Sequence, residues 1–181
     1  CALRYGSLIS KGQQWSMPSS QYNHLYNNYN VRCEGFASPF NSKLIGKPES
    51  KFCSLFKDTD TVFGSIGDFF KTNMTEEAEC WAVNPPFIEQ VLYSSAKHII
   101  KNMITGKKLF VFYIMPGWFD SNTYEILNQS KYTKYKKVLN KNKYFYEYEG
   151  KKIIARFNSV VFVLDNYSNN NNLYNKICKG M

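Results

Sequence analysis

The sequence lacks the features of several specialised protein classes. It contains no run of eighteen apolar residues, which a membrane-spanning helix requires, and no stretch that resembles a signal peptide. Its cysteines are few, odd in number and scattered without a C-x-x-C pair, which indicates reduced thiols rather than a disulfide framework or a zinc site. No group of side chains has metal-ligand spacing. We therefore expect a soluble protein of a reducing compartment, nuclear or cytoplasmic, with no membrane or metal partner.

Acidic residues are also scarce relative to basic ones. The chain of 181 residues has 23 Lys and Arg against 14 Asp and Glu, which gives a net charge of +9 and an isoelectric point near 9.2. Such a balance predicts an anionic partner, with nucleic acid as the first candidate. Hydrophobic residues make up 44% and aromatic residues 17%, which argues against disorder. The length predicts a single folded domain over residues 1–181.

Four residues, Asn84-Pro85-Pro86-Phe87, carry the most specific chemistry of the chain. They follow an apolar run over 80–83, which predicts a strand, and precede an amphipathic helix that begins at Ile88. A strand that ends at Asn-Pro-Pro-aromatic and leads into a helix is the arrangement used to methylate an exocyclic amine. The alternative is a proline-rich turn after a buried strand.

The amine explains why these residue types are needed. The lone pair of an adenine amino nitrogen is delocalised into the ring, so the nitrogen is a poor nucleophile. The Asn84 side-chain carbonyl and a backbone carbonyl just after it can accept the two N–H hydrogens and localise that pair. The two prolines stiffen the backbone that aims these acceptors. An aromatic ring at Phe87 can stack on an extruded base.

The hydrophobic periodicity predicts an α/β fold. Helical spacing predicts helices over 18–29 and 88–103, and Gly106 ends the second. Strands are predicted over 31–37, 52–56, 80–83 and 109–115, with a glycine-punctuated loop over 64–67. Further strands over 143–149, 153–157 and 159–164, with a tight turn at Gly150, predict antiparallel pairing near the C-terminus.

This order of elements matches the sheet of class I (Rossmann-like) S-adenosylmethionine-dependent methyltransferases, with a C-terminal antiparallel strand pair. In open α/β sheets the ligand binds outside the carboxyl ends of the strands. The segments 38–41 and 84–87 both follow predicted strands. We therefore expect them to face one crevice, in which the first contacts the cofactor and the second contacts the substrate.

Residues 131–152 form a basic tract rich in aromatic side chains. Eight lysines stand against Glu147 and Glu149, and six tyrosines and phenylalanines are interleaved with them. Lysines can neutralise phosphates while aromatic rings stack on bases. This pattern makes Lys136, Lys137 and Lys143 candidate substrate-binding residues. The alternative is a solvated strand face backed by tyrosines in the core.

Several strings of residues, taken in order, resemble one known family. They are Gln14-Trp15-Ser16-Met17-Pro18, Glu34-Gly35-Phe36-Ala37-Ser38-Pro39-Phe40-Asn41, Asp58-Thr59-Asp60 with Phe63-Gly64-Ser65, Asn84–Phe87, and Ile114-Met115-Pro116-Gly117-Trp118. Residues 13–166 resemble the catalytic core of the phosphorylated-CTD-interacting-factor family, the cap-specific adenosine-N6 methyltransferases. Residues 167–181 form an Asn-rich insert and tail. The resemblance implies a Rossmann-like core that uses S-adenosylmethionine to methylate the adenosine beside the mRNA cap.

The resemblance also implies roles for individual residues. Asn84, Pro85, Pro86 and Phe87 correspond to the catalytic motif, in which Asn84 and the Pro85 carbonyl accept from the target amine and Phe87 stacks on adenine. Trp118 is expected to face the substrate. The residues expected at the cofactor, with Asp60 preferred to Asp58 as its acidic contact and with Trp15 and Pro18 closing over it, are Ser38, Pro39, Asn41, Asp60, Gly64, Ser65, Glu34, Trp15 and Pro18.

The residues leave some of these roles open. The segment 58–60 also fits an N-capping turn, Glu34 also fits an ion pair with Arg32, and Trp15 and Trp118 also fit plain packing roles. The family's WW module and helical domain are absent from this sequence, and a longer parent protein could supply them. The expected partners are RNA, as capped mRNA, and RNA polymerase or a helical partner domain. The lysine and asparagine bias is typical of AT-rich protist or large-virus genomes.

Two other functions compete with methylation of capped RNA. The order of the motifs also resembles phage-type DNA adenine methyltransferases, so internal RNA, poly(A) or DNA is an alternative substrate. An inactive methyltransferase-fold subunit that binds RNA or a partner is the alternative from another class. The intact motif over 84–87 favours an active enzyme, because a subunit without turnover has no need of the asparagine.

Overall fold

The computed structural model describes residues 4–5, 15–168, 174 and 176. The asparagine tract and most of the predicted tail over 167–181 lie outside the described residues, as do Cys1, Cys178 and residues 13–14 of the family-like region. None of the helices in the described ranges is long and apolar enough to cross a membrane. Within the same ranges no group of three or more His, Cys, Asp and Glu side chains is arranged to hold a metal ion.

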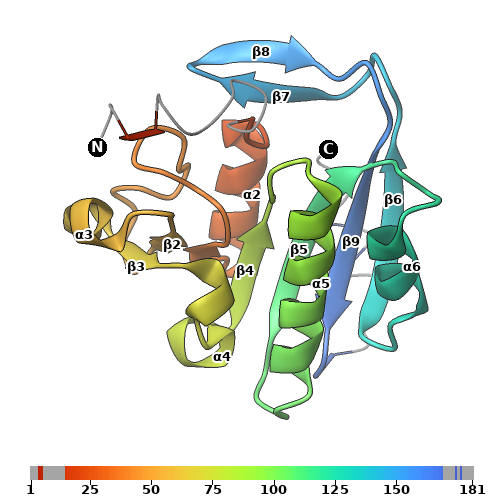
Figure 1. The fold of residues 1–181 in the computed structure, drawn as a ribbon, viewed down its shortest axis with the longest axis horizontal. Helices are drawn as coiled ribbons and strands as arrows, with labels where there is room; N and C mark the ends of the chain where they lie inside the picture. Colours follow the sequence, from red (N-terminus) through yellow and green to blue (C-terminus); the bar gives the residue numbers. More distant parts are fainter. Residues whose placement is uncertain (1–3, 6–14, 169–173, 175, 177–181) are drawn as a thin grey trace.

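A seven-stranded sheet forms the centre of the protein (Figure 1). Strands β3, β2, β1, β4 and β5 are parallel neighbours in that order. Strand β9 runs antiparallel to both β5 and β6, while β7 and β8 form a separate antiparallel hairpin. The predicted α/β class and an antiparallel pair near the C-terminus are confirmed. The strand bounds are β1 Cys33–Glu34, β2 Lys51–Cys53, β3 Ser65–Gly67, β4 Cys80–Val83, β5 Phe110–Pro116, β6 Thr133–Leu139, β7 Phe145–Tyr148, β8 Lys151–Ile154 and β9 Ser159–Asp165.

Helices cover both faces of this sheet. The long ones are α2 (Ser19–Tyr29), α5 (Glu89–Met103) and α6 (Asn122–Gln129). Short helices follow the three-residue strands β2 and β3: α3 (Lys57–Asp60), η2 (Thr61–Phe63), η3 (Phe69–Lys71) and α4 (Met74–Glu77). Figure 1 shows α5 and α6 in front of the sheet and α2 behind it.

The central strands are buried on both sides because their residues alternate between two cores. In β4, Cys80 and Ala82 pack with α2, and Trp81 and Val83 pack with α5. All seven residues of β5 and of β9 are buried in the same alternating way. The continuous apolar run over 109–115 is therefore a strand covered on both faces, as its sequence predicts.

Several predicted boundaries are wrong. The strand predicted over 31–37 is regular only at Cys33–Glu34. After it the pairing becomes irregular: the Gly35 amide donates to the Ala82 carbonyl of β4, whereas the Ala37 amide donates to the Cys53 carbonyl of β2. The strand predicted over 52–56 ends at Cys53, and the chain then enters α3. The loop predicted over 64–67 contains β3, which pairs with β2.

The C-terminal third also differs from the prediction. The basic tract is divided between β6, at one edge of the sheet, and the β7–β8 hairpin. Strand β9 pairs with β5 and β6, and β8 has its partner in β7. The turn at Gly150 is confirmed, since Glu149 and Gly150 both have positive φ, at 49° and 73°. This conformation suits a two-residue hairpin turn.

The hairpin is fastened to the segment before α2. Ser16 and Glu147 exchange two backbone hydrogen bonds of 3.0 and 2.8 Å. The Glu147 carboxylate accepts from the Ser19 hydroxyl at 2.6 Å, from the Ser19 amide at 3.2 Å and from the Lys43 ammonium at 2.8 Å. Figure 1 shows the hairpin lying across the end of the sheet towards which β4 and β5 point. It therefore stands over the carboxyl ends of these strands.

Candidate active site

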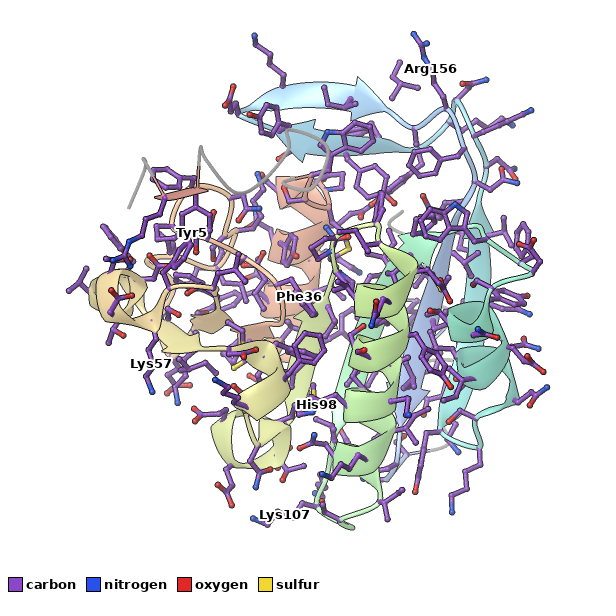
Figure 2. All side chains as sticks on the ribbon, viewed as in Figure 1. Tyr5, Phe36, Lys57, His98, Lys107 and Arg156 are labelled. Carbon is purple, nitrogen blue, oxygen red and sulfur yellow. The ribbon has the colours of Figure 1, made fainter. Side chains whose placement is uncertain are left out.

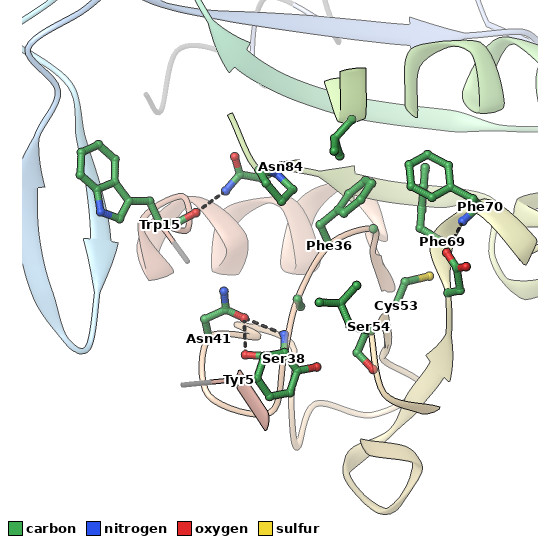
Figure 3. Close-up of a pocket in the computed structure, with 16 residues that line it drawn as sticks. Tyr5, Trp15, Phe36, Ser38, Asn41, Cys53, Ser54, Phe69, Phe70 and Asn84 are labelled. Atoms are coloured by element: carbon green, nitrogen blue, oxygen red, sulfur yellow. Dashed lines mark hydrogen bonds between the residues drawn. The ribbon is translucent and has the colours of Figure 1, made fainter. Parts of the chain in front are cut away.

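A cavity of about 310 Å³ opens at the carboxyl ends of four neighbouring strands (Figure 3). Its walls come from the segments that follow β1, β2, β3 and β4, together with α5 and two N-terminal residues. The volume lies in the range of small-molecule sites. Strand β1 has β2 on one side and β4 on the other, so the strand order reverses here, which is where open α/β sheets bind ligands. The lining residues are Tyr5, Trp15, Gly35, Phe36, Ala37, Ser38, Asn41, Cys53, Ser54, Leu55, Asp68, Phe69, Phe70, Asn84, Pro86 and Val91.

The loop after β1 forms one wall through a compact turn. The Asn41 side-chain oxygen accepts from the Ser38 amide at 2.7 Å and from the Ser38 hydroxyl at 3.0 Å. At Gly35 an added Cβ would lie 3.0 Å from Val83 and 3.1 Å from Phe69, which is closer than side chains normally pack. The glycine therefore lets this loop leave β1 tightly against β4. Ser38 and Asn41 line the cavity as predicted, whereas Pro39 does not.

An aromatic wall with one carboxylate lies after β3. The ring of Phe36 is 4.7 Å from that of Phe69 and 5.7 Å from that of Phe70, measured between centroids. Asp68 caps η3 by accepting from the Phe70 amide at 2.9 Å. The second Asp68 oxygen lies 4.0 Å from the Lys71 ammonium. Flat apolar rings beside a carboxylate suit a ligand that has a heteroaromatic ring and hydrogen-bond donors.

The predicted acidic contact of the cofactor, Asp60, is not part of this cavity. Its side chain is fully buried and accepts from the Tyr5 hydroxyl at 2.5 Å. Asp58 forms a 2.8 Å ion pair with Arg4 on the surface. The two carboxylates of this segment thus attach the N-terminal residues to α3, and Tyr5 itself lines the cavity. The carboxylate among the lining residues is Asp68.

Asn84 supplies the hydrogen-bond acceptor of the site. It follows β4, is only 6% exposed and lines the cavity. Its side-chain nitrogen donates to the Trp15 carbonyl at 2.9 Å. A backbone carbonyl can only accept, so this bond fixes the orientation of the amide. The side-chain oxygen then has no hydrogen-bond partner among the described residues, although it is buried.

Phe87 does not line this cavity. Its ring meets Tyr146 and Phe157 edge-on, at centroid distances of 5.4 and 5.8 Å. Trp15 stacks on the same two rings from another side. These four side chains form an aromatic cluster between the cavity and the β7–β8 hairpin. Pro86 lines the cavity, and Pro85 is buried beside it.

Most of the other predicted cofactor contacts do not line the cavity. Pro18 is buried at the start of α2, and Trp15 lines the cavity without it. Gly64, with φ of 97°, ends η2. Ser65 is buried and shares a 2.6 Å hydrogen bond with Ser54, a lining residue. Ser65 therefore supports the cavity and does not face it.

Glu34 is buried beneath the loop after β1. Its carboxylate accepts from the Ser42 hydroxyl at 2.8 Å and from the Lys43 amide at 3.0 Å. The predicted alternative of an ion pair with Arg32 is wrong, because Arg32 donates to the Tyr26 carbonyl and stacks on the Tyr26 ring. Burial raises the pKa of Glu34 from its ordinary value of 4.5 to about 7, and the hydrogen bonds oppose this rise.

We expect Glu34 to make stability fall as pH rises through neutrality. The folded protein keeps a proton on Glu34 that the unfolded chain releases above pH 4.5, so the stabilisation is complete below that pH and is lost as pH passes about 7. Glu34→Gln should melt like the wild type at pH 5 and be more stable at pH 8, by on the order of 2 kcal/mol. Thermal melting from pH 5 to 8 measures this, with Glu125→Gln on the exposed face of α6 as the control. Parallel curves for wild type and Glu34→Gln would contradict it.

The predicted substrate lysines are separated from the cavity. Strand β6 is three strands away from β4 in the order β4-β5-β9-β6. The Lys136 ammonium donates to the Tyr124 hydroxyl at 2.9 Å and to the Asn128 side chain at 2.7 Å, which ties it to α6. Lys137 lies beside it on β6, while Lys143 is exposed before β7. Trp118 follows β5 with its side chain 38% exposed, outside the cavity lining.

The tyrosines of the basic tract divide in the same way. Tyr144 and Tyr146 are buried. The Tyr144 hydroxyl donates to the Gln21 side-chain oxygen, and the Tyr146 and Ser159 hydroxyls share a hydrogen bond. They belong to the core on the α2 side of the sheet and not to a base-stacking surface. For these two residues the alternative of a tyrosine-rich core face is correct.

Sequence reasoning missed several residues of the cavity. Asp68 and the Phe69-Phe70 pair follow a three-residue strand between two glycines of positive φ, which has too few residues for a periodic signal. Cys53 also lines the cavity, and burial raises the pKa of its thiol to about 12, so it is no nucleophile at neutral pH. Tyr5 reaches the cavity through long-range contacts alone.

Comparison with known proteins gives a consistent set of relatives. The family described as "Phosphorylated CTD interacting factor 1 WW domain" matches residues 2–149. A mouse protein named "mRNA (2'-O-methyladenosine-N(6)-)-methyltransferase" is 29% identical over 131 residues. The human protein of the same name is 29% identical over 134 residues. Each comparison covers 71% of this chain and 18% of the relative, so the chain spans less than a fifth of the length of these curated relatives.

Proposed function

The chain belongs to the phosphorylated CTD interacting factor 1 WW domain family, and on this premise we propose that it transfers a methyl group from S-adenosylmethionine to the N6 amine of adenosine in RNA. The substrate we propose is the adenosine next to the cap of mRNA; the names of the mouse and human relatives give 2′-O-methyladenosine N6 in mRNA as the position those proteins methylate. The observation that carries the proposal is the Asn84 side-chain oxygen. It is buried, fixed in orientation by Trp15, and has no partner among the described residues.

The sheet supports a class I, Rossmann-like methyltransferase fold. Its first five strands follow the order 3-2-1-4-5, which is the core order of doubly wound sheets that bind nucleotides. The antiparallel β9 between β5 and β6 agrees with the predicted antiparallel element at the C-terminal side. The cavity lies at the switch point of this order, where such a fold binds its ligand.

The lining residues fit S-adenosylmethionine. The Phe36, Phe69 and Phe70 rings offer apolar faces to an adenine, and the Asp68 carboxylate is placed to accept hydrogen bonds from an amine or hydroxyls. The turn held by Ser38 and Asn41 closes the wall next to Asn84. When bound, this cofactor supplies an activated methyl group to a nucleophile in line with its sulfonium.

The protein's own contribution is to activate and position the amine. The Asn84 side-chain oxygen accepts a hydrogen bond from one N–H of the target nitrogen, and the Pro85 carbonyl is the proposed acceptor for the second N–H. Both acceptors favour a lone pair localised on nitrogen and aimed at the methyl group. Because the Trp15 carbonyl already holds the Asn84 amide, little reorganisation is needed in the transition state. The product nitrogen can release its proton to water.

Methyl transfer to a matched panel of substrates tests the proposal. The panel contains capped RNA that starts with adenosine, the same RNA without its cap, poly(A) and single-stranded DNA. We expect labelled methyl groups on the capped RNA, recovered by nucleoside analysis as N6-methylated 2′-O-methyladenosine when the acceptor carries a 2′-O-methyl group. Preferential labelling of another member of the panel would replace capped RNA as the proposed substrate. The proposed methyl transfer to an adenine amine would still stand. No labelling of any member, with cofactor bound, would contradict the proposal.

We expect Asp68 to contribute more to cofactor binding than the other carboxylates near the sheet edge. Asp68→Ala should weaken the binding of S-adenosylmethionine about tenfold or more, because a hydrogen bond to a charged group contributes roughly 1.5–3 kcal/mol. Asp68→Asn keeps an oxygen that can cap η3 and should lose less. Isothermal titration calorimetry measures both affinities.

Two further variants serve as controls for this prediction. Asp120→Ala removes an exposed carboxylate from the loop after β5 and should leave the affinity unchanged. Asp60→Asn tests the residue predicted from the sequence, which lies outside the cavity and holds Tyr5. A loss in Asp60→Asn that exceeds the loss in Asp68→Ala, with both variants folded, would return the role to Asp60.

A further inference from the structure

A second hollow lies on the other side of Trp15 from the candidate active site. It is an open groove of about 540 Å³ between the N-terminal segment and the hairpin strand β8. No residue of the groove belongs to the predicted substrate contacts Lys136, Lys137 and Lys143. The groove is lined by Trp15, Lys152, Ile153, Ile154, Arg156 and Phe157.

The groove and the cavity share one wall. Trp15 lines both of them, and its carbonyl is the group that orients Asn84. Phe157, at the base of the groove, meets Phe87 edge-on at 5.8 Å. A polymer whose reacting base reached Asn84 would therefore continue past Trp15 along the hairpin. Figure 2 shows Arg156 beyond the end of β8, where the chain leaves the hairpin for β9, on the side of the molecule opposite to Lys107.

The chemistry of the groove combines cations with apolar and aromatic surface. Lys152 and Arg156 are exposed, and no acidic residue is among the lining residues. The Trp15 and Phe157 rings are parallel to within 4°. Ile154 leaves 61% of its side chain exposed beside them. A surface that combines cations with flat aromatic rings binds single-stranded nucleic acid through phosphates and base stacking.

We propose that this groove binds the nucleotide next to the target adenosine in single-stranded RNA. Arg156 and Lys152 contact its phosphates, and its base lies over the apolar floor formed by Ile154 and the Trp15–Phe157 pair. The proposal rests on the proposed function, since it assigns a path to the substrate of the same site. It places RNA contacts on the β7–β8 hairpin and not on β6.

Binding of a short RNA tests this assignment without turnover. The probe is a fluorescent five-nucleotide single-stranded RNA with one adenosine, and its anisotropy is titrated in the presence of S-adenosylhomocysteine at several salt concentrations. The groove variant is Lys152→Gln with Arg156→Gln. The control is Lys101→Gln in the last turn of α5 with Lys107→Gln just after this helix, which removes the same charge; Figure 2 shows Lys107 on the side of the molecule opposite to Arg156. All four side chains are exposed, so folding should be unaffected.

We expect the groove variant to lose about tenfold in affinity and to reduce the salt slope by roughly 1.4, or 0.7 for each lost phosphate contact. The control should remain within about twofold of the wild type. A mononucleotide, adenosine monophosphate, should bind both variants equally, because it has no neighbouring nucleotide.

Three results would overturn the proposal that this groove binds RNA. They are an unchanged slope in the groove variant, an equal loss in both variants, and no binding of the RNA by the wild type. Methyl transfer is scored separately. Binding through the groove without methyl transfer to any substrate would contradict the proposed function alone, whereas methyl transfer with unchanged binding in the groove variant would contradict the groove alone.

Discussion

Asn84→Ala is expected to lower the rate of methyl transfer by about a hundredfold or more while leaving cofactor affinity within a few-fold of the wild type. Loss of one preorganised acceptor of this kind typically costs about 10²–10³ in turnover. The cofactor should still bind, because the aromatic wall and Asp68 remain. Single-turnover rates on the best substrate and calorimetry with S-adenosylmethionine measure the two effects. A variant that keeps more than about a tenth of the rate would exclude the assigned role.

Asn84→Asp separates the two halves of the amide. An aspartate keeps an acceptor for the target amine but cannot donate to the Trp15 carbonyl, which the wild-type nitrogen does at 2.9 Å. We expect its rate to lie between those of the wild type and Asn84→Ala. A rate equal to that of the wild type would show that the bond to Trp15 does not matter for catalysis.

Trp81→Ala is expected to destabilise the fold by about 3–5 kcal/mol, the range for removing a large aromatic side chain from a core. Trp81 is fully buried in β4, three residues before Asn84, and its ring nitrogen donates to the Met74 and Ala78 carbonyls at 3.2 and 3.0 Å. Its removal leaves a cavity between β4 and α4 and takes the indole donor from the Ala78 carbonyl, while the Met74 carbonyl still accepts from the Ala78 amide. Urea unfolding monitored by circular dichroism measures the loss.

Trp81→Phe is the matched control for this prediction. It keeps most of the ring volume and removes only the donor, so the expected loss is about 1–2 kcal/mol, the cost of two weak hydrogen bonds. The difference between the two variants reports the packing contribution. A loss below about 1 kcal/mol in Trp81→Ala would contradict the burial of this side chain.

The elements predicted well are those whose signal is local. Strand β4 and the Asn-Pro-Pro turn are specified by a few consecutive residues. The run Cys80–Val83 is apolar throughout and becomes a buried strand, and the prolines that follow end it. The helix over 89–103 shows a full helical period. The family resemblance stated from short strings is confirmed by a match over residues 2–149. It did not depend on knowing how the strings meet in space.

Which acidic residue lines the cavity depends on how elements meet in space, and the sequence favoured Asp60, which is not among the lining residues. Asp60 and Asp68 both follow short strands and turns, and nothing in the sequence says which of them faces the crevice. The outcome is decided by Tyr5, which reaches across from the N-terminal segment and buries the Asp60 carboxylate. Asp68 directly follows β3 and lines the cavity together with Phe36 from the segment after β1. Such an exchange requires contacts between residues more than fifty positions apart.

How the basic tract folds could not be predicted for a similar reason. Its composition is uniform over 131–152, but the chain makes two separate elements of it. Strand β6 continues the sheet edge and pairs with β9, whereas β7 crosses over to pair with Ser16. Lysine content alone cannot distinguish the two. The groove beside Trp15 also has no sequence signature, because its walls come from positions 15 and 152–157.

The position of the β7–β8 hairpin in the chain has an evolutionary consequence. Strands β6 and β9 are hydrogen-bonded neighbours up to Leu139 and Ser159, so everything between these residues is an excursion that leaves and re-enters the sheet at adjacent points. Changes in the length of such an excursion cost little, about 0.6 kcal/mol for each doubling. Insertions at the exposed turn around Gly150 can be accommodated while β4, Asn84 and the cavity keep their register, whereas Tyr146 and Glu147 of the same hairpin contact Trp15, Ser16 and Ser19. We therefore expect relatives of this protein to differ in length at this turn and to keep the residues on either side of it.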